Sequence, residues 1–444
     1  MRSTAAVRRN VHAPAVAERT AHSPGSRLKS IVGGSAGNLV EWYDWYAYSA
    51  LTIYFAPVFF PKEDKTAQLL SAAAIFAVGF LMRPIGAWLM GIYSDRHGRK
   101  SGLALSVGFM AAGSLLIAVS PTYARAGAIA PAVLVIARML QGLSVGGEYG
   151  ASATYLSEMA LRNRRAFWAS FQYLTLIGGQ LLALAVVVAL QLAMSEAHLQ
   201  EWGWRVAFGI GALLAIAVYI LRTRLAETQS FQNLAEDRQR SSAASLWRRH
   251  PREFLIVAAI SGGGSAAFYA YTTYMQKFLT NTSGFSRTSA TEIMTIALVV
   301  FMLIQPLWGV AADRWGRKPN LYLFGFGGML VSVPIFTAIS HTSTPAIALT
   351  LVLTPLVLLG AYTSISGLIK AELFPAHIRT LGVALPYAVG NCIFGGTAEY
   401  IALWFKQAGS ESGFYWYLTA IIGMAAVAFV MLPETKTTSL IEED

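Results

Sequence analysis

The 444-residue chain is 55% hydrophobic and only 13% charged, and its formal net charge is +11. Soluble proteins carry about 25% charged residues, so this composition and a mean hydropathy of +0.50 indicate a membrane protein. The basic residues lie in short loops between apolar segments rather than along one face of a soluble domain. That placement excludes a nucleic-acid-binding protein.

A spanning helix needs about 20 predominantly apolar residues. In chain order, this criterion predicts twelve spans in two groups of six, at 30–58, 67–91, 101–120, 131–159, 166–194, 204–222, 253–279, 288–311, 320–339, 345–370, 380–405 and 413–432. We therefore expect an all-α membrane protein with two six-helix bundles. The predicted domains are a tail at 1–28, a bundle at 29–222, a linker at 223–252, a bundle at 253–432 and a tail at 433–444.

The distribution of lysine and arginine predicts the orientation of these spans. Of the 34 such residues, we place 25 in the tails, the linker and the loops on the side of the termini, and 7 on the opposite side. Basic residues accumulate on the cytoplasmic side, so both termini are expected in the cytoplasm. Residues 1–28 have no apolar signal-peptide core. They read as a cytoplasmic tail, with a mitochondrial presequence as the alternative.

A charged loop is repeated at half-chain spacing, because residues 91–100 and 309–318 share six of ten positions. Two further patterns recur after the later spans, namely a glutamate and an arginine seven residues apart, and a Glu-Thr pair. We expect these residues to form a latch that holds helix ends together in one state and releases them in another. Each aspartate is expected to meet a cation or a helix N-terminus in its own half, although anchoring of topology alone is the alternative. The latch residues are Asp95, Arg96, Arg99, Glu158, Arg165, Glu227, Asp313, Arg314, Arg317, Glu372, Arg379 and Glu434.

Charged residues deep in a span cost at least about 2.5–3.5 kcal/mol, so they usually have a partner and a role. All seven histidines lie in predicted tails, loops or span ends. A proton moving through this protein would therefore be carried by a carboxylate, and Glu41, Asp44 and Glu148 are the candidates. A static ion pair that fixes helix packing is the alternative.

Several motifs resemble a known family along most of the chain. The pattern Gly-x-x-x-Asp-Arg-x-Gly-Arg-Lys and the ending at 432–436 are similar to signatures of the major facilitator superfamily. The segments 37–44 and 138–148 resemble helices 1 and 4 of its metabolite:proton symporter family. The segments 170–173, 271–277, 363–367, 370–376 and 395–400 resemble the members that carry α-ketoglutarate. The resemblance implies a fold of two six-helix bundles around a central cavity, in the bacterial inner membrane.

The resemblance also implies a proton symporter that imports α-ketoglutarate, with citrate, shikimate or an osmolyte such as proline or betaine as alternative substrates. A dicarboxylate needs cations and hydroxyl donors in a low-dielectric cavity. We expect Asp44 to pair with Arg138, and Glu399 at least to neutralise Lys277. Three glycines at 262–264 are expected to let the seventh span, 253–279, break or bend. The expected partners are the organic acid, the proton and the bilayer, with no nucleic acid, cofactor, metal or enzymatic activity, and we expect a monomer. The candidate substrate-binding residues are Arg83, Arg138, Lys277, Tyr46, Tyr173, Tyr271 and Tyr274.

Overall fold

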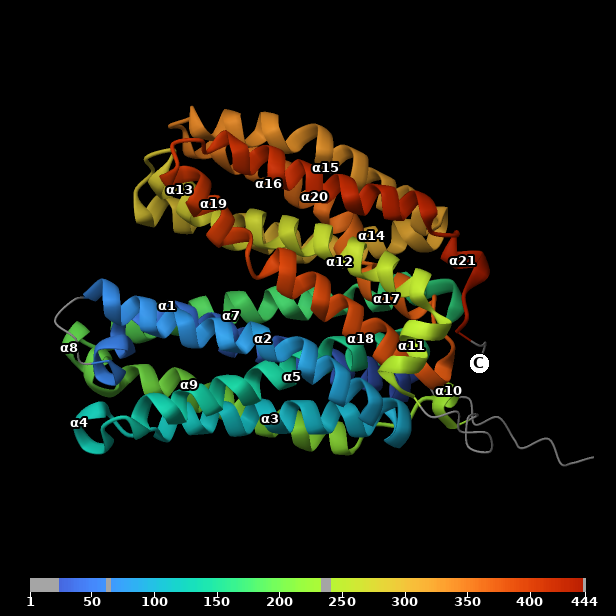
Figure 1. Ribbon diagram of the computed structural model, residues 1–444, viewed down its shortest axis with the longest axis horizontal. Helices are drawn as coiled ribbons and strands as arrows, with labels where there is room; N and C mark the ends of the chain where they lie inside the picture. Colours follow the sequence, from blue (N-terminus) through green and yellow to red (C-terminus); the bar gives the residue numbers. More distant parts are fainter. Residues whose placement is uncertain (1–23, 61–64, 233–240, 442–444) are drawn as a thin grey trace, which may run out of the picture.

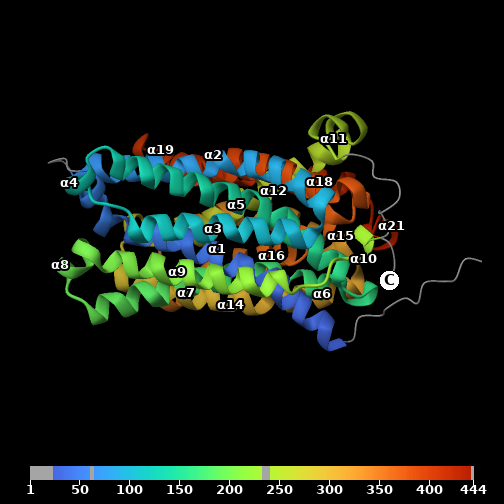
Figure 2. The ribbon, with the colours of Figure 1, turned by 90° about the horizontal axis from the view of Figure 1, so that it is seen from below.

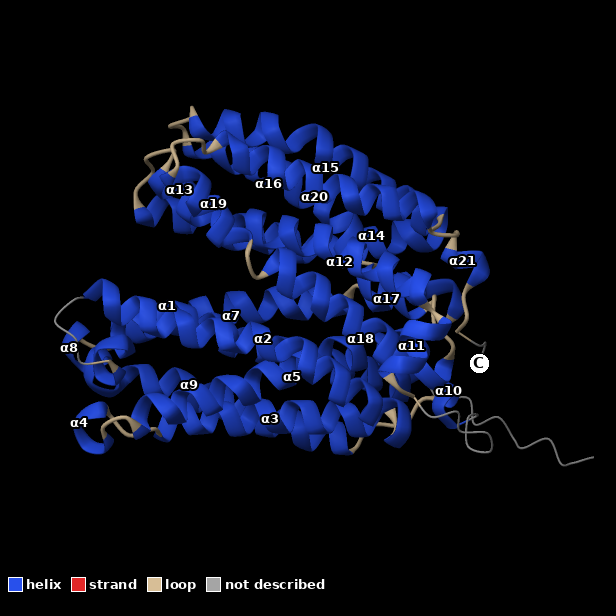
Figure 3. Cartoon of the chain, viewed as in Figure 1, coloured by secondary structure: helices blue, strands red, loops and turns tan. Residues whose placement is uncertain are grey.

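The computed structural model describes residues 24–60, 65–232 and 241–441, and within these ranges the chain forms helices and loops but no strand (Figure 3). The predicted N-terminal tail lies mostly outside the described residues, as do 233–240 of the predicted linker and 442–444 of the C-terminal tail. The prediction of an all-α protein is confirmed.

The N-terminal half contains six long helical stretches, some of them interrupted. Their elements are α1 (Pro24–Phe59), α2 (Lys65–His97), α3 (Arg99–Val119), α4 (Tyr123–Ala126), α5 (Ile129–Met159), η1 (Arg162–Arg164), α6 (Arg165–Ala169), α7 (Phe171–Ala193), α8 (Glu196–His198), η2 (Leu199–Gly203) and α9 (Trp204–Thr223). Two short helices follow in the predicted linker, α10 (Gln229–Gln232) and α11 (Ala243–Arg249).

The C-terminal half repeats this plan. Its elements are α12 (Pro251–Tyr269), η3 (Ala270–Tyr274), α13 (Met275–Asn281), α14 (Arg287–Trp315), α15 (Arg317–Ser340), α16 (Pro345–Thr363), α17 (Ser366–Ala371), η4 (Ala376–Ile378), α18 (Arg379–Gly390), η5 (Asn391–Gly395), α19 (Ala398–Gln407), α20 (Ser412–Met431) and α21 (Thr435–Thr438). The three glycines at 262–264 lie inside α12, which is continuous, so the helix does not break there; the π-helical turn η3 follows at its end. The glycine at 264 instead admits the ring of Tyr362, which would lie 2.1 Å from an added Cβ.

Ten helical stretches between residues 99 and 431 are long and apolar enough to cross a membrane. The helices α1 and α2, with 36 and 33 residues, bring the number of long stretches in the described chain to twelve. Both carry buried charges, since Glu41 and Asp44 lie on α1 and Arg83 lies on α2. The prediction of twelve helices therefore agrees with the observed architecture.

The two halves form two groups of long helices (Figure 1). They lie against each other at the end that carries α10, α11, α18 and α21, and they diverge toward the end that carries α4, α8 and α13. We call the first the motif end, because both repeated loops lie there. Seen from the direction of Figure 2, α11 lies at the edge of the molecule beside α18.

Each repeated loop contains two glycines at positions where a side chain would be unfavourable. Gly98 and Gly316 have φ of 106° and 100°, a left-handed region that favours glycine, and each separates two long helices. At Gly91 an added Cβ would lie 2.9 Å from Leu381 Cα, and at Gly309 it would lie 2.7 Å from the carbonyl oxygen of Ala166. The first glycine of each loop therefore permits close approach of the opposite half.

Candidate functional site

The repeated aspartate of the N-terminal half binds the start of a helix in the C-terminal half. Asp95 accepts hydrogen bonds from the backbone N–H groups of Thr380 and Leu381, both at 3.1 Å, in the first turn of α18. Arg99 lies 3.3 Å from the same carboxylate, and both side chains are fully buried. The free N–H groups and the positive end of the helix dipole stabilise a carboxylate here. We call this contact the N-terminal joint.

The second aspartate makes the reciprocal contact. Asp313 accepts hydrogen bonds from the backbone N–H groups of Ala166 and Phe167, both at 2.9 Å, at the start of α6. Arg317 lies 3.5 Å from its carboxylate. We call this contact the C-terminal joint. Each aspartate therefore meets a cation of its own half, as expected, namely Arg99 or Arg317. The helix start that it also binds belongs to the opposite half, so both joints connect the halves.

The helix that follows each repeated loop is capped by a glutamate of a Glu-Thr pair, so its N-terminal N–H groups are not available to the aspartate. Glu227 accepts from the backbone N–H groups of Arg99 and Lys100 at 3.0 and 3.3 Å. Glu434 accepts from Arg317 and Lys318 at 2.9 and 3.0 Å. Each glutamate thus caps the helix that follows the repeated loop of its own half.

These two glutamates differ in pKa. Burial raises the pKa of Glu227, and the N–H groups of Thr228, Arg99 and Lys100 offset that rise only in part. Burial also acts to raise the pKa of Glu434. In that case the N–H groups of Arg317, Lys318 and Lys436 outweigh it and lower the pKa below its ordinary value.

The glutamate and arginine that recur seven residues apart also connect the halves. Glu158 forms ion pairs with Arg99 at 3.4 Å and with Arg379 of the opposite half at 2.5 Å. Glu372 forms an ion pair with Arg317 at 3.1 Å. The equal spacing of Glu158 and Arg165 therefore reflects the repeat, while the ion pair of Glu158 across the halves is with Arg379.

The remaining latch residues differ in exposure. Arg165 is buried at the start of α6, beneath the C-terminal joint. Arg96 donates to the backbone carbonyl of Ser241 in the linker at 3.0 Å. Arg314, its counterpart, is exposed like Arg96, but its guanidinium makes no hydrogen bond or ion pair with another described residue. The two copies of the loop therefore differ at this position.

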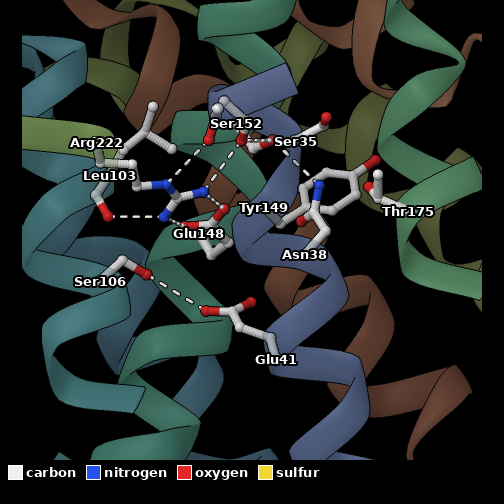
Figure 4. A network of polar contacts seen from close by, with 12 residues as sticks. Ser35, Asn38, Glu41, Leu103, Ser106, Glu148, Tyr149, Ser152, Thr175 and Arg222 are labelled. Atoms are coloured by element: carbon white, nitrogen blue, oxygen red, sulfur yellow. Dashed lines mark hydrogen bonds and ion pairs between the residues drawn. The ribbon is translucent and has the colours of Figure 1, made fainter. Parts of the chain in front are cut away.

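Inside the N-terminal bundle, Glu148 forms a two-pronged ion pair with Arg222 at the end of α9 (Figure 4). Arg222 also donates to the carbonyl oxygens of Leu103 and Gly34 at 2.8 and 3.0 Å. Glu148 is therefore held as the charged partner of a fully buried arginine.

Glu41, on α1, lies near this pair but in a different environment (Figure 4). It accepts hydrogen bonds from Ser144 at 2.6 Å and Ser106 at 3.4 Å. Among the described residues, Glu41 has no ion-pair partner within 4 Å. A buried carboxyl that meets only hydroxyl groups is a group that can hold a proton.

Asp44 and Arg138, the expected pair, are linked through two further side chains. Ser114 donates to Asp44, Gln141 donates to Ser114 at 3.2 Å, and Arg138 donates to Gln141 at 2.6 Å. The Arg138 guanidinium also lies between the rings of Trp45 and Tyr48, at 4.2 and 4.3 Å. These contacts of Arg138 all lie within the N-terminal half, whereas the substrate site proposed below lies between the halves, so we leave Arg138 out of it.

Arg83 faces the opposite half. Its guanidinium lies over the rings of Phe80 and Trp45, at 4.0 and 4.2 Å, and donates to the hydroxyl of Tyr269 on α12 at 3.1 Å. Only 2% of Arg83 is exposed, and its Nε and Nη2 atoms have no hydrogen-bond partner among the described residues. A buried guanidinium with two unused donor nitrogens is suited to bind a carboxylate.

A second buried cation lies on the C-terminal side. Lys370 on α17 donates to the hydroxyls of Tyr149 and Ser366, at 2.7 and 2.9 Å. Its ammonium group also lies 4.6 Å from the ring of Tyr387, which stacks on Tyr149 with 3.4 Å between ring centroids. From the sequence we counted Lys370 among the charges of the cytoplasmic side, but it is fully buried between the halves.

The other candidate residues fall into two groups. Tyr46 bonds Thr273 across the halves at 3.1 Å, and both residues line a cavity of about 90 Å³ together with Trp45, Ser49, Phe80, Tyr269, Gly395, Gly396 and Glu399. Glu399 forms the expected ion pair with Lys277, whose side chain is half exposed. Tyr173 is buried against Phe268 of the opposite half.

Tyr271 and Tyr274 lie elsewhere. The hydroxyl of Tyr271 bonds Ser332 at 2.7 Å, and Tyr274 packs edge-on against Phe414, so both point into the C-terminal bundle. Both residues belong to the π-helical turn η3, whose wider turn shifts the face on which they lie relative to a continuous α-helix. We therefore leave both out of the proposed substrate site.

Sequence reasoning missed two buried cations, Arg222 and Lys370. Both lie close in sequence to a polar segment, and they were counted with the loops for that reason. The signal that could have found Arg222 is the buried acid at Glu148, which needs a cation. The clue for Lys370 is its place in an otherwise apolar stretch, at 365–371.

Two repeated six-helix halves, joined by reciprocal contacts around buried cations, define a membrane transporter of the alternating-access type. Known proteins share this architecture. A family model described as "Sugar (and other) transporter" matches residues 30–252 and 229–444. The chain belongs to this family.

Relatives agree with this assignment. The chain is 53% identical over 405 residues to the alpha-ketoglutarate permease of Escherichia coli, covering 91% of this chain and 93% of that protein. It is 31% identical to a citrate-proton symporter of Salmonella typhi, covering 93% and 96%. A solved structure of a proton:xylose symporter bound to 6-bromo-6-deoxy-D-glucose superposes with a TM-score of 0.79, at 19% identity, covering 94% of this chain and 98% of that one. The last match establishes a shared fold.

Proposed function

We propose that this chain is a proton symporter that imports α-ketoglutarate across the bacterial inner membrane by alternating access. The observation that carries the proposal is the 53% identity to a named alpha-ketoglutarate permease over nearly the full length of both chains. The citrate-proton symporter is more distant, at 31% identity. Citrate is therefore the competing substrate, and it carries one more carboxylate.

The substrate site in this proposal lies between Arg83 and Lys370. The two cations come from opposite halves, and a dicarboxylate has one charge for each. The unused Nε and Nη2 atoms of Arg83 would receive one carboxylate as a fork. The ammonium of Lys370 would receive the other, with Tyr149 as a neighbouring hydroxyl donor. Tyr46 and Tyr173 lie at the same interface, while Lys277 is paired with Glu399 toward the end where the halves diverge.

Proton coupling in this proposal rests on Glu41 and Asp44. Each accepts hydrogen bonds from serine hydroxyls, which can also act as acceptors toward a protonated carboxyl. Glu148 is the weaker candidate because both of its carboxylate oxygens are already engaged by Arg222. Gln141 and Ser114 link Asp44 to Arg138 through hydrogen bonds. Movement of Arg138 would therefore change the electrostatic potential at the Asp44 carboxyl group.

The proposal places the motif end and both termini in the cytoplasm, as the distribution of basic residues predicts. Contacts between the halves at that end would then close the cytoplasmic side, while the helices diverge toward the outside (Figure 1). We further propose that one chain is the transporting unit, because each half already provides one of the two cations.

Uptake of labelled α-ketoglutarate into proteoliposomes under an imposed pH gradient tests the proposal, with citrate, shikimate and proline as competitors. We expect gradient-dependent accumulation that unlabelled α-ketoglutarate suppresses most strongly. Arg83→Gln and Lys370→Gln should each reduce uptake at least about tenfold, because a charged hydrogen bond contributes about 1.5–3 kcal/mol. Arg205→Gln, on the outer end of α9, is the matched control.

Two results would contradict the proposal. If citrate is accumulated and α-ketoglutarate is not, the substrate is wrong. If accumulation does not depend on the gradient, proton symport is wrong. Retained uptake in both Arg83→Gln and Lys370→Gln would remove the proposed substrate site while leaving the transport activity itself intact.

A further inference from the structure

The C-terminal joint lies beside a hollow of about 450 Å³ at the surface of the motif end. It is formed by both halves, because η1 and α6 provide one wall and the end of α14 provides the other. The residues that line it are Asn163, Arg164, Phe167, Val310, Asp313 and Arg314.

The corresponding position at the N-terminal joint is occupied by the linker. Ser241 donates to Asp95 at 3.1 Å, and its carbonyl oxygen accepts from Arg96 at 3.0 Å. Next to it, Leu246 of α11 packs in one buried cluster with Ile378 and Leu381. The fold thus covers one joint with its own chain, while the equivalent place at the other joint is a lined hollow.

The hollow carries unbalanced positive charge. Arg164 and Arg314 come from opposite halves, and neither guanidinium has a hydrogen bond or an ion pair with another described residue. Asp313 also lines the hollow, but its two oxygens already accept from the N–H groups of Ala166 and Phe167, with Arg317 beside them. Its negative charge is therefore directed to the helix start, and the two arginines dominate the field.

The hollow also lies where a membrane-facing surface ends. Leu303, Leu307 and Val310 follow one another at helical spacing on α14 and are 59%, 68% and 52% exposed. Arg314 continues this stripe one turn later, and the neighbouring Trp315 is 64% exposed. An apolar stripe that ends in arginine and tryptophan is typical of the depth of lipid headgroups.

We infer that this hollow binds the headgroup of an anionic phospholipid. The phosphate lies between Arg164 and Arg314, and the acyl chains run along the stripe of Leu303, Leu307 and Val310. Because the two arginines belong to opposite halves, the lipid connects the halves at the joint that the linker does not cover. It would take the place that Ser241 and α11 occupy at the other joint.

Native mass spectrometry of the purified full-length protein, titrated with phosphatidylglycerol or phosphatidylcholine, tests the inference. We expect the wild type to retain phosphatidylglycerol in preference to phosphatidylcholine. Arg164→Gln/Arg314→Gln should bind phosphatidylglycerol roughly 25-fold more weakly, since each basic residue near a membrane surface contributes about a factor of five. The control is Arg224→Gln/Arg248→Gln, which removes two exposed charges from the same end outside the hollow.

Equal loss of phosphatidylglycerol in the control pair would overturn the site, because it would indicate general attraction of lipid to basic surface. Displacement of the lipid by an equal concentration of inorganic phosphate would overturn the choice of ligand, because it would indicate a site for a soluble anion. Unchanged binding in Arg164→Gln/Arg314→Gln would overturn the inference altogether. An unchanged thermal midpoint in the double variant would establish that it is folded.

Discussion

The N-terminal and C-terminal joints make the same contact in different surroundings. Asp95 and Asp313 each accept two backbone N–H groups at the start of a helix in the opposite half. Asp95, however, is almost fully buried beneath the linker, whereas Asp313 lines an open hollow. A repeated sequence thus repeats a contact, and the part of the chain outside the repeat decides how strongly that contact is held.

The ion pairs behind the joints differ in the same direction. Glu158 lies between Arg99 of its own half and Arg379 of the other, and it also accepts from Thr228 at 2.5 Å. Among the described residues, Glu372 forms an ion pair with Arg317 of its own half, at 3.1 Å. Glu158 is thus shared by arginines of both halves, whereas the ion pair of Glu372 lies within one half.

The largest effect is expected from Glu158→Gln, which leaves two buried arginines without their common carboxylate. Removing one partner of a buried ion pair costs about 3–5 kcal/mol. Glu372→Gln should cost less, about 1.5–3 kcal/mol, because it affects one arginine, and Arg317 keeps Asp313 as a carboxylate neighbour at 3.5 Å. Thermal and denaturant unfolding of the purified protein would measure both, with Glu196→Gln on the exposed α8 as the control. Equal losses of unfolding free energy in Glu158→Gln and Glu372→Gln would contradict the proposed difference between the two ion-pair networks.

A smaller effect is expected at the joints themselves. Asp95→Asn and Asp313→Asn each lose a charge-assisted hydrogen bond, which contributes about 1.5–3 kcal/mol. This energy corresponds to at least a tenfold change in the ratio of molecules with the motif end closed to molecules with it open. Asp95→Asn should shift the population further, because it also disturbs Ser241. Electron spin resonance distances between labels at Arg224 and Trp315, in a Cys392→Ser background, would report separation of the halves.

The expected result is a longer distance in both variants, with the larger change for Asp95→Asn. Glu292→Gln is a suitable control, because this exposed acid lies on α14 far from either joint. Unchanged distances in both aspartate variants would contradict the role of the joints in holding the halves together. A larger change for Asp313→Asn would reverse the ranking.

Much of this arrangement follows from sequence, because span length and hydropathy depend on local composition. The repeat also identified the aspartates and glutamates of both joints. It could not identify their partners, since the choice between a helix start in the same half and one in the opposite half depends on where Glu227 and Glu434 lie in space. The spacing of residues in the sequence does not give these positions.

Depth in the membrane was the second quantity that the sequence did not provide. Arg222 lies one residue before the end of α9, yet its side chain extends back to Glu148 and is fully buried. Lys370 lies in the short helix α17, which continues α16 after a turn and so places the ammonium between the halves. A count of residues from the nearest loop assigns both to the surface, whereas side-chain length and a break in the helix place both inside.

The smallest effect is expected from the pH dependence of the two capping glutamates. The reference pKa of both is 4.5, and it is raised in Glu227 but lowered in Glu434. A lowered pKa stabilises the folded state above the unfolded value, and this stabilisation is lost as the pH falls through the folded value. The stability difference between the wild type and Glu434→Gln should therefore grow as the pH rises to about 4.5.

Glu227→Gln should behave in the opposite way. A raised pKa means that the charged form is disfavoured in the folded state, so the wild type loses stability as the pH rises from 4.5 through the folded value. The stability difference between the wild type and Glu227→Gln should shrink over that interval. Thermal midpoints of both variants across this pH range would measure the two slopes. If the stability differences of the Glu227→Gln and Glu434→Gln variants changed with pH in the same direction, the proposed difference in burial between Glu227 and Glu434 would be contradicted.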